Sequence, residues 1–271
     1  MGGAARRVGF HRFNQEGLYT GDFLTHKVMY NAQIHTGHVF LDLVHALIAP
    51  QGGIPIVKRP KAGDDLGIPR LTTDAGTAAA IWAKLAAINP LIDPSKKLIV
   101  LNPNASKRFP MRRLPLESYA ELARQLLEEP DVFVIITGVA EEQPDAVHIF
   151  QHVGSPRVVD LTGQTTMMEL LHLFNLAQVL ISNDSGPAHF ACLTRVHVMV
   201  FFGPELPDRY RPLADSFDVI YTNYSCSPCV SPYNQRLSPC NDNLCLKSID
   251  IDAVSERVKR RLHAVGLPQP A

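Results

Sequence analysis

The sequence lacks a long hydrophobic run, since no stretch of about 18 apolar residues occurs anywhere in it. Its first ten residues, MGGAARRVGF, lack the apolar core of a secretory signal. An excess of one charge is also lacking, because 26 Lys and Arg residues balance 26 Asp and Glu residues. We therefore expect no membrane-spanning segment, a cytoplasmic protein, and no binding of nucleic acid through bulk charge.

The dinucleotide fingerprint G-x-G-x-x-G is absent, and cysteines are few. Of the five cysteines, Cys192 stands apart, while Cys226, Cys229, Cys240 and Cys245 lie close together. A reducing cytoplasm favours free or reversibly oxidised thiols. The alternative is structural zinc, because four thiolates at such spacing can bind the metal, although the second pair is not CxxC.

What is present is an ordinary globular composition, with 46% hydrophobic and 19% charged residues among 271. Short apolar runs alternate with helical patterns from residue 97 onward. The expected strands lie at 97–103, 132–138, 157–163, 178–184, 196–204 and 217–222, and the expected helices at 114–129, 144–153, 166–177 and 186–194. Because these runs are continuously apolar, they predict an α/β fold with a Rossmann-like, doubly wound parallel sheet.

The first 90 residues are less regular. Two amphipathic helices are expected at 35–49 and 73–88, the second capped by Thr73 or Asp74. A Pro- and Gly-rich loop separates them, and RRVGF at 6–10 is the one strand candidate. With 88–97 as linker, the pattern predicts a partial N-terminal domain over 1–90 and a complete C-terminal domain over 91–271.

The stretch SNDSGPAHFA combines several groups that suit a binding site. Asp184 and Ser185 can cap the following helix, Gly186 permits close approach of a ligand, and Pro187 fits the first helical turn. The exposed N–H groups there could hold phosphate, with His189 one turn further on. The alternative is a capped helix start with a structurally satisfied histidine.

Longer stretches resemble a known family. LISNDSGPAHFACL followed by VHVMVFFGPELP is similar to the signature of the glycosyltransferase family nine heptosyltransferases. LIVLNPNASKRFPMRRLPLESYAELARQLL resembles the first strand, phosphate loop and helix of that family's C-terminal domain. VIITGVAEEQPDA and VVDLTGQTTMMELLHLFNLA resemble the next two units, so that the likeness covers residues from about 97 to about 262.

The resemblance implies a two-domain GT-B enzyme that transfers heptose, with inversion, from ADP-heptose to the lipopolysaccharide core. It implies an ADP-sugar donor, a lipid A–core saccharide acceptor, and no required cofactor. The basic run RVKRR at 257–261 is typical of a solvated face, but it could also contact an anionic membrane, so that peripheral association with the inner face of the inner membrane is the alternative. The family's N-terminal glycine-rich unit, with its general-base aspartate, has no counterpart here. We therefore expect an N-terminally truncated chain whose catalytic base is not among its residues.

Site residues carry over from the family by motif. The turn that holds the donor diphosphate and sugar matches Asp184, Ser185, Gly186 and His189, with Pro187 beside them. Other expected donor contacts are Ser106 with a basic partner for phosphate, an acid for ribose, and Thr165 for adenine. The basic partner is Lys107, Arg112 or Arg113, and the acid is Glu141 or Glu142. Two alternatives stay open: a donor-binding fragment without turnover, and a GT-B-like sugar-nucleotide epimerase, for which no acid and base pair is identifiable.

Overall fold

The computed structural model describes residues 3–11, 23–48, 66–105, 109–234 and 237–264. The chain forms two compact units. The smaller unit comprises Met1–Gly67, Pro204–Tyr210 and Ser225–Asn241, and the larger unit comprises Ile68–Gly203, Arg211–Tyr224 and Asp242–Ala271. The chain therefore first crosses between units after Gly67, whereas the sequence pattern placed the boundary at residue 90.

The larger unit is built on one sheet of six parallel strands in the order β5-β4-β3-β6-β7-β8. The strands are β3 (Lys97–Asn102), β4 (Val132–Ile136), β5 (Val158–Asp160), β6 (Val179–Asn183), β7 (His197–Phe202) and β8 (Phe217–Tyr221). Each of the six strand predictions is thus confirmed to within a few residues. The strand order reverses beside β3, since β4 follows on one side and β6 on the other.

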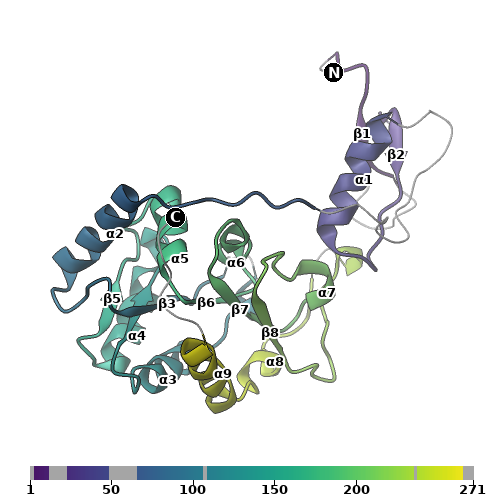
Figure 1. The fold of residues 1–271 in the computed structure, drawn as a ribbon. Helices are drawn as coiled ribbons and strands as arrows, with labels where there is room; N and C mark the ends of the chain where they lie inside the picture. The colour runs from purple at the N-terminus through teal and green to yellow at the C-terminus, as the bar shows by residue number, and fades with distance from the viewer. Residues whose placement is uncertain (1–2, 12–22, 49–65, 106–108, 235–236, 265–271) are drawn as a thin grey trace. The chain divides into compact units, whose positions relative to one another are not determined.

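Helices cover both faces of this sheet (Figure 1). The helices α3 (Leu116–Leu126), α4 (Gln143–Val153) and α9 (Ile251–Ala264) pack with Ile99 and Leu101 of β3 into one apolar core. Leu98 and Val100 alternate with them along the strand and are also fully buried. On the opposite face lie α5 (Met167–Leu176) and α6 (Gly186–Phe190) (Figure 1). Burial on both faces explains why the strands read as continuous apolar runs.

Helix α2 (Ala75–Ile88) belongs to the larger unit, where it packs against α5 and buries Ala78, Ile81 and Leu85. The Asp74 side chain caps its start by accepting from the Thr77 N–H, as expected. Thr166 and Glu169 form the expected capping box at the start of α5. The Lys84 ammonium of α2 lies 2.7 Å from the Glu169 carboxylate and thereby ties the two helices together.

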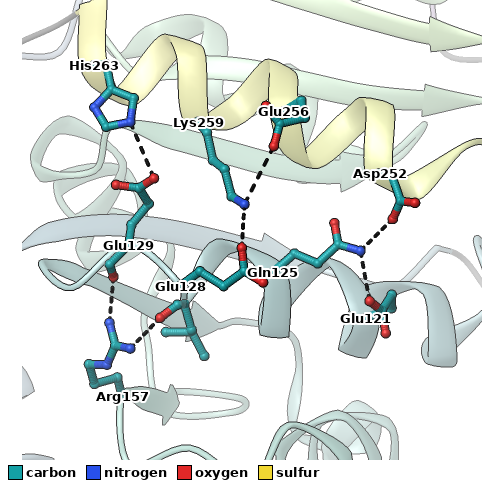
Figure 2. A network of polar contacts seen from close by, with 10 residues as sticks. Glu121, Gln125, Glu128, Glu129, Arg157, Asp252, Glu256, Lys259 and His263 are labelled. Atoms are coloured by element: carbon teal, nitrogen blue, oxygen red, sulfur yellow. Dashed lines mark hydrogen bonds and ion pairs between the residues drawn. The ribbon is translucent and has the colours of Figure 1, made fainter.

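Polar contacts also join α9 to α3 (Figure 2). The Lys259 ammonium lies 2.7 Å from a Glu128 carboxylate oxygen, and the Gln125 side-chain amide donates to Asp252 at 2.6 Å. Beneath these contacts, Val258 and Leu262 of α9 are almost fully buried. Exposed ion pairs contribute roughly 0–1 kcal/mol each, so the apolar face supplies most of the attachment.

The smaller unit contains a parallel pair of strands, β1 (Val8–Phe10) and β2 (His26–Val28), with α1 (Thr36–Ile48). The sequence pattern identified β1 and α1 but missed β2, which is too short to show a period. The Phe10 and Tyr30 rings meet edge to face, 5.0 Å apart, in its small core. No helix in the described part of the chain is long and apolar enough to cross a bilayer.

Short helical turns complete the two units. They are η2 (Pro110–Arg112), η3 (Ala140–Glu142), η4 (Ala191–Leu193) and α8 (Leu244–Lys247) in the larger unit, and α7 (Pro207–Tyr210) and η5 (Pro232–Asn234) in the smaller.

Candidate functional site

A pocket of about 360 Å³ opens in the larger unit where β3, β4 and β6 end. This volume lies within the range of about 300–1,000 Å³ that is usual for small-ligand sites. Its walls come from four connections, and the lining residues are Asn102, Asn104, Ala105, Gly138, Val139, Glu142, Thr165, Thr166, Met167, Leu170, Ser185, Gly186, Pro187 and Phe190. Ligands of doubly wound sheets bind in this place, beside the point where the strand order reverses.

The turn after β6 supplies Ser185, Gly186 and Pro187 to the pocket wall. Ser185 occupies the N-cap position of α6 but makes no side-chain capping bond there, contrary to expectation. Its hydroxyl instead lies 3.1 Å from the Ser182 hydroxyl. Because α6 has only five residues, its dipole is small, and charge for an anion has to come from side chains.

The charges nearest this turn are those of Asp184, Arg112 and His189. An Asp184 carboxylate oxygen lies 3.3 Å from the Arg112 Nη1, and the other oxygen lies 3.9 Å from the His189 Nε2. The Asp184 side chain is only 5% exposed. Desolvation by neighbouring protein atoms lowers the pKa of His189, and the Arg112 guanidinium lowers it further. The imidazole is therefore held in its neutral form near pH 7.

Like Arg112, the other expected basic and hydroxyl ligands of the phosphates lie between β3 and α3 in the chain. The Arg113 guanidinium is directed to Asp145 at 2.7 Å and to the Asn104 side chain, so it serves the loop's own structure. Ser106 and Lys107 lie outside the described residues. Of the two basic candidates that the structure describes, Arg112 is the one that lies beside Asp184.

The structure favours Glu142 over Glu141 as the acid of the pocket. Glu142 lines the pocket, whereas Glu141 points to solvent. The Glu142 Oε2 accepts a hydrogen bond from the Val139 N–H at 2.9 Å. A Cβ at Gly138 would lie 2.7 Å from that oxygen, so a larger residue there would displace the Glu142 carboxylate from this position. Of these two candidates, η3 turns the second glutamate toward the pocket.

Thr165 lines the pocket as expected, and several residues not foreseen from the sequence lie near it. The apolar side chains Val139, Met167, Leu170 and Phe190 form much of the wall. Val139, Met167 and Phe190 are also substantially exposed to solvent. Apolar groups at an open edge suit the face of a planar ring.

The four clustered cysteines differ in how far they are buried. Cys226 is exposed, Cys229 and Cys240 are half-buried, and Cys245 is buried. Among the described residues, no three Cys, His, Asp or Glu side chains lie close enough together to hold a metal ion. Structural zinc therefore remains a prediction from spacing alone.

Comparison with known proteins places this chain in a family. The family described as glycosyltransferase family 9 (heptosyltransferase) matches residues 57–237. The chain belongs to glycosyltransferase family 9. Lipooligosaccharide heptosyltransferase 2 of Campylobacter jejuni is 26% identical over 182 residues, which are 66% of this chain and 56% of that protein. Lipopolysaccharide heptosyltransferase 2 of Escherichia coli is 26% identical over 60% of this chain and 45% of its own length.

Solved structures of family 9 proteins share the fold. The Escherichia coli ADP-heptose lipopolysaccharide heptosyltransferase II superposes with a TM-score of 0.69 at 20% identity, over 97% of this chain and 71% of that one. A family 9 protein of Veillonella parvula gives a TM-score of 0.65 at 17% identity, over 90% and 64%. The present chain spans about half the length of the curated relatives that it matches.

Proposed function

We propose that the pocket binds the nucleotide of an ADP-sugar and that the protein is an inverting heptosyltransferase of GT-B type. The sugar is a heptose or a similar one, and the acceptor is a lipopolysaccharide core saccharide. Membership of family 9 and the names of its heptosyltransferase relatives support the class of reaction. The observation that carries the site is the pocket itself, formed by the Ser185–Pro187 turn, Glu142 and Thr165 around one hollow.

In this proposal each wall of the pocket meets one part of the donor. The apolar edge at Val139, Met167 and Leu170 takes adenine, and the Glu142 carboxylate accepts hydrogen bonds from the ribose hydroxyls. The diphosphate lies over the Ser185–Gly186 turn, where the backbone can approach closely. The Arg112 guanidinium offsets the negative charge that develops on the leaving diphosphate. No described residue is assigned as the base that deprotonates the acceptor.

The test compares nucleotides and two neighbouring glutamates. Calorimetric titration of the chain with ADP, UDP and GDP should give the tightest binding with ADP. Glu142→Gln keeps the shape of the side chain and its bond to the Val139 N–H, but loses the charge that strengthens bonds to ribose. We expect it to weaken ADP binding about ten-fold, because hydrogen bonds to charged groups are worth about 1.5–3 kcal/mol.

Glu141→Gln is the matched control, since it makes the same change one residue away on the exposed side. It should leave the affinity for ADP unchanged. Absence of binding of any nucleoside diphosphate would overturn the proposed site. Binding of ADP-sugar without transfer to a lipopolysaccharide core acceptor would instead favour a donor-binding chain without turnover.

A further inference from the structure

The loop between β3 and α3, residues 103–115, carries Arg112 and borders the pocket. We call it the β3–α3 loop. Residues 106–108 of this loop lie outside the described ranges. In its described part, the short turn η2 is the only helix or strand that could fix the path of the loop. A guanidinium at the end of a flexible side chain, on a loop free to move, would bind an anion weakly. Side chains from other parts of the larger unit, however, hold this loop in place.

Asn183 holds both ends of the loop. It is the last residue of β6 and is fully buried. Its Nδ2 donates to the Pro103 carbonyl at 2.7 Å, and its Oδ1 accepts from the Leu114 N–H at 2.9 Å. One amide thus closes the loop at its two ends, immediately before Asp184 in the chain.

Asn243 holds the middle of the loop, at Arg112 itself. Its Nδ2 donates to the Arg113 carbonyl at 2.7 Å and to the Met111 carbonyl at 3.3 Å. These two carbonyls stand on either side of Arg112 in the chain. The amide nitrogen carries two N–H groups, and two carbonyl acceptors use both. The Arg112 guanidinium then lies 5.0 Å from the Phe109 ring centroid and 3.3 Å from Asp184.

The segment that carries Asn243 is itself fixed to the sheet. Asn243 immediately precedes α8, which packs at the ends of β7 and β8. A Cβ at Gly203, just after β7, would lie 2.7 Å from the Leu246 Cγ and 2.9 Å from the Cys245 Sγ. The Thr222 hydroxyl, just after β8, donates to the Cys245 carbonyl at 2.9 Å. The segment that carries Asn243 is therefore packed against and hydrogen-bonded to the residues that follow β7 and β8.

We propose that Asn243 is a positioning residue for the donor diphosphate. By holding the carbonyls of Met111 and Arg113, it fixes the backbone on both sides of Arg112 and so presents the guanidinium beside the Asp184 turn. This inference rests on the proposed function, since it assumes that a diphosphate lies over that turn. Its physical basis is preorganisation: a charged group held in place before the ligand arrives loses less entropy on binding.

The test separates the phosphates from the rest of the nucleotide. Dissociation constants for ADP and for adenosine are measured with the unaltered chain, Asn243→Ala and Asn243→Asp. Asp is close in shape to Asn, but its carboxylate cannot donate to the two carbonyls. For both variants we expect ADP to bind about ten-fold more weakly. Each variant loses the hydrogen bonds from the Asn243 amide to the two backbone carbonyls, and a hydrogen bond of ordinary strength is worth about 1 kcal/mol. The loss affects only the contact between Arg112 and the phosphates. Adenosine should bind as it does to the unaltered chain.

Asn89→Ala is the matched control, because the Asn89 Nδ2 also donates to a backbone carbonyl, that of Pro156 at 2.6 Å, in a connection outside the pocket lining. This variant should change neither the dissociation constant for ADP nor that for adenosine. An equal loss for ADP and adenosine would overturn the inference, since it would mean that Asn243 only maintains the pocket. Unchanged ADP affinity in a folded variant would overturn it as well.

A double-mutant cycle identifies the group through which Asn243 acts. In an Arg112→Ala background, Asn243→Ala should weaken ADP binding no further, because the guanidinium that it positions is gone. Fully additive losses would overturn the inference. Failure of the unaltered chain to bind ADP would overturn the proposed function first, and that result is seen before any variant is made.

Discussion

At the scale of single residues, Asp184 pairs with charged and polar groups next to the Ser185–Pro187 turn that lines the pocket. Its side chain is almost completely buried and lies 3.3 Å from the Arg112 guanidinium, with the neutral His189 imidazole 3.9 Å away. A buried carboxylate needs a positively charged partner, and Arg112 supplies it. In the proposed donor complex, the same carboxylate would accept hydrogen bonds from sugar hydroxyls but would repel the diphosphate. Its charge therefore has opposite effects on the two halves of the donor.

This opposition predicts how Asp184→Asn behaves. Binding of an ADP-sugar should weaken about ten-fold, because a charge-assisted bond to the sugar becomes a neutral one. Binding of ADP should stay the same or tighten, because a negative charge next to the phosphates is removed. Titration with both ligands measures the difference, and urea unfolding checks that the variant is folded. Equal affinity for the ADP-sugar before and after the change would remove Asp184 from the sugar site.

Residues that directly follow a strand could be placed from the sequence. Ser185, Gly186 and Pro187 line the pocket because a parallel sheet brings all its carboxyl ends to one edge. The choice between Glu141 and Glu142 could not be made, because it depends on the rotation of one helical turn. Asn243 could not be found either. Its approach to Arg113 depends on how α8 packs against Gly203, which no local pattern records.

At the scale of elements, α9 is joined to the edge of the sheet by His197 of β7 and Asp218 of β8. The His197 Nε2 lies 3.1 Å from an Asp218 oxygen, and its Nδ1 lies 2.8 Å from the Ser216 hydroxyl. Since a carboxylate only accepts, Nε2 carries the hydrogen, and the neutral ring accepts from Ser216. From α9, Arg257 pairs with Asp218, and the Arg261 guanidinium lies 3.1 Å from Ser216.

This junction predicts a stability that depends on pH. Burial lowers the pKa of His197; Asp218 opposes this, and Arg261 and Arg257 add to it. His197 therefore binds a proton more readily in the unfolded chain than in the folded chain. The free energy of unfolding should accordingly fall as pH drops below about 6.5. His197→Gln should reduce this fall between pH 8 and pH 5.5 in urea titrations. His263→Gln, on the exposed end of α9, is the control and should keep the dependence on pH.

Helices and strands with a clear hydrophobic pattern were predicted from the sequence. Elements that form only through contact with another part of the chain were not. The six strands of the larger sheet were recognisable because each contains a short run of mostly apolar residues. Strand β2 has three residues and exists only because β1 pairs with it. Helix α2 was recognised as a helix, but its amphipathic pattern could not show which unit it joins. That choice depends on the surface against which its buried residues Ala78, Ile81 and Leu85 pack, with the Lys84–Glu169 pair as an added contact.

At the scale of the whole molecule, the two units have separate cores of very different size. The larger unit buries both faces of a six-stranded sheet, whereas the core of the smaller unit gathers around Tyr30, Ala32 and Val39. The residues that line the pocket all belong to the larger unit. Chains with separate cores commonly unfold in more than one step. A ligand that binds one unit then stabilises that unit by mass action.

We therefore predict that ADP shifts only one of two thermal transitions. At a concentration of one hundred times its dissociation constant, a ligand adds about 2.7 kcal/mol to the stability of the unit that binds it. For a unit of this size class, that amounts to a rise in Tm of roughly 5–10 °C. Differential scanning calorimetry should show the shift, and hydrogen exchange should assign it to β3 and β6, with α1 unaffected as internal reference. A single transition, or equal protection of α1, would mean that both units unfold together and that the pocket's ligand stabilises the whole chain.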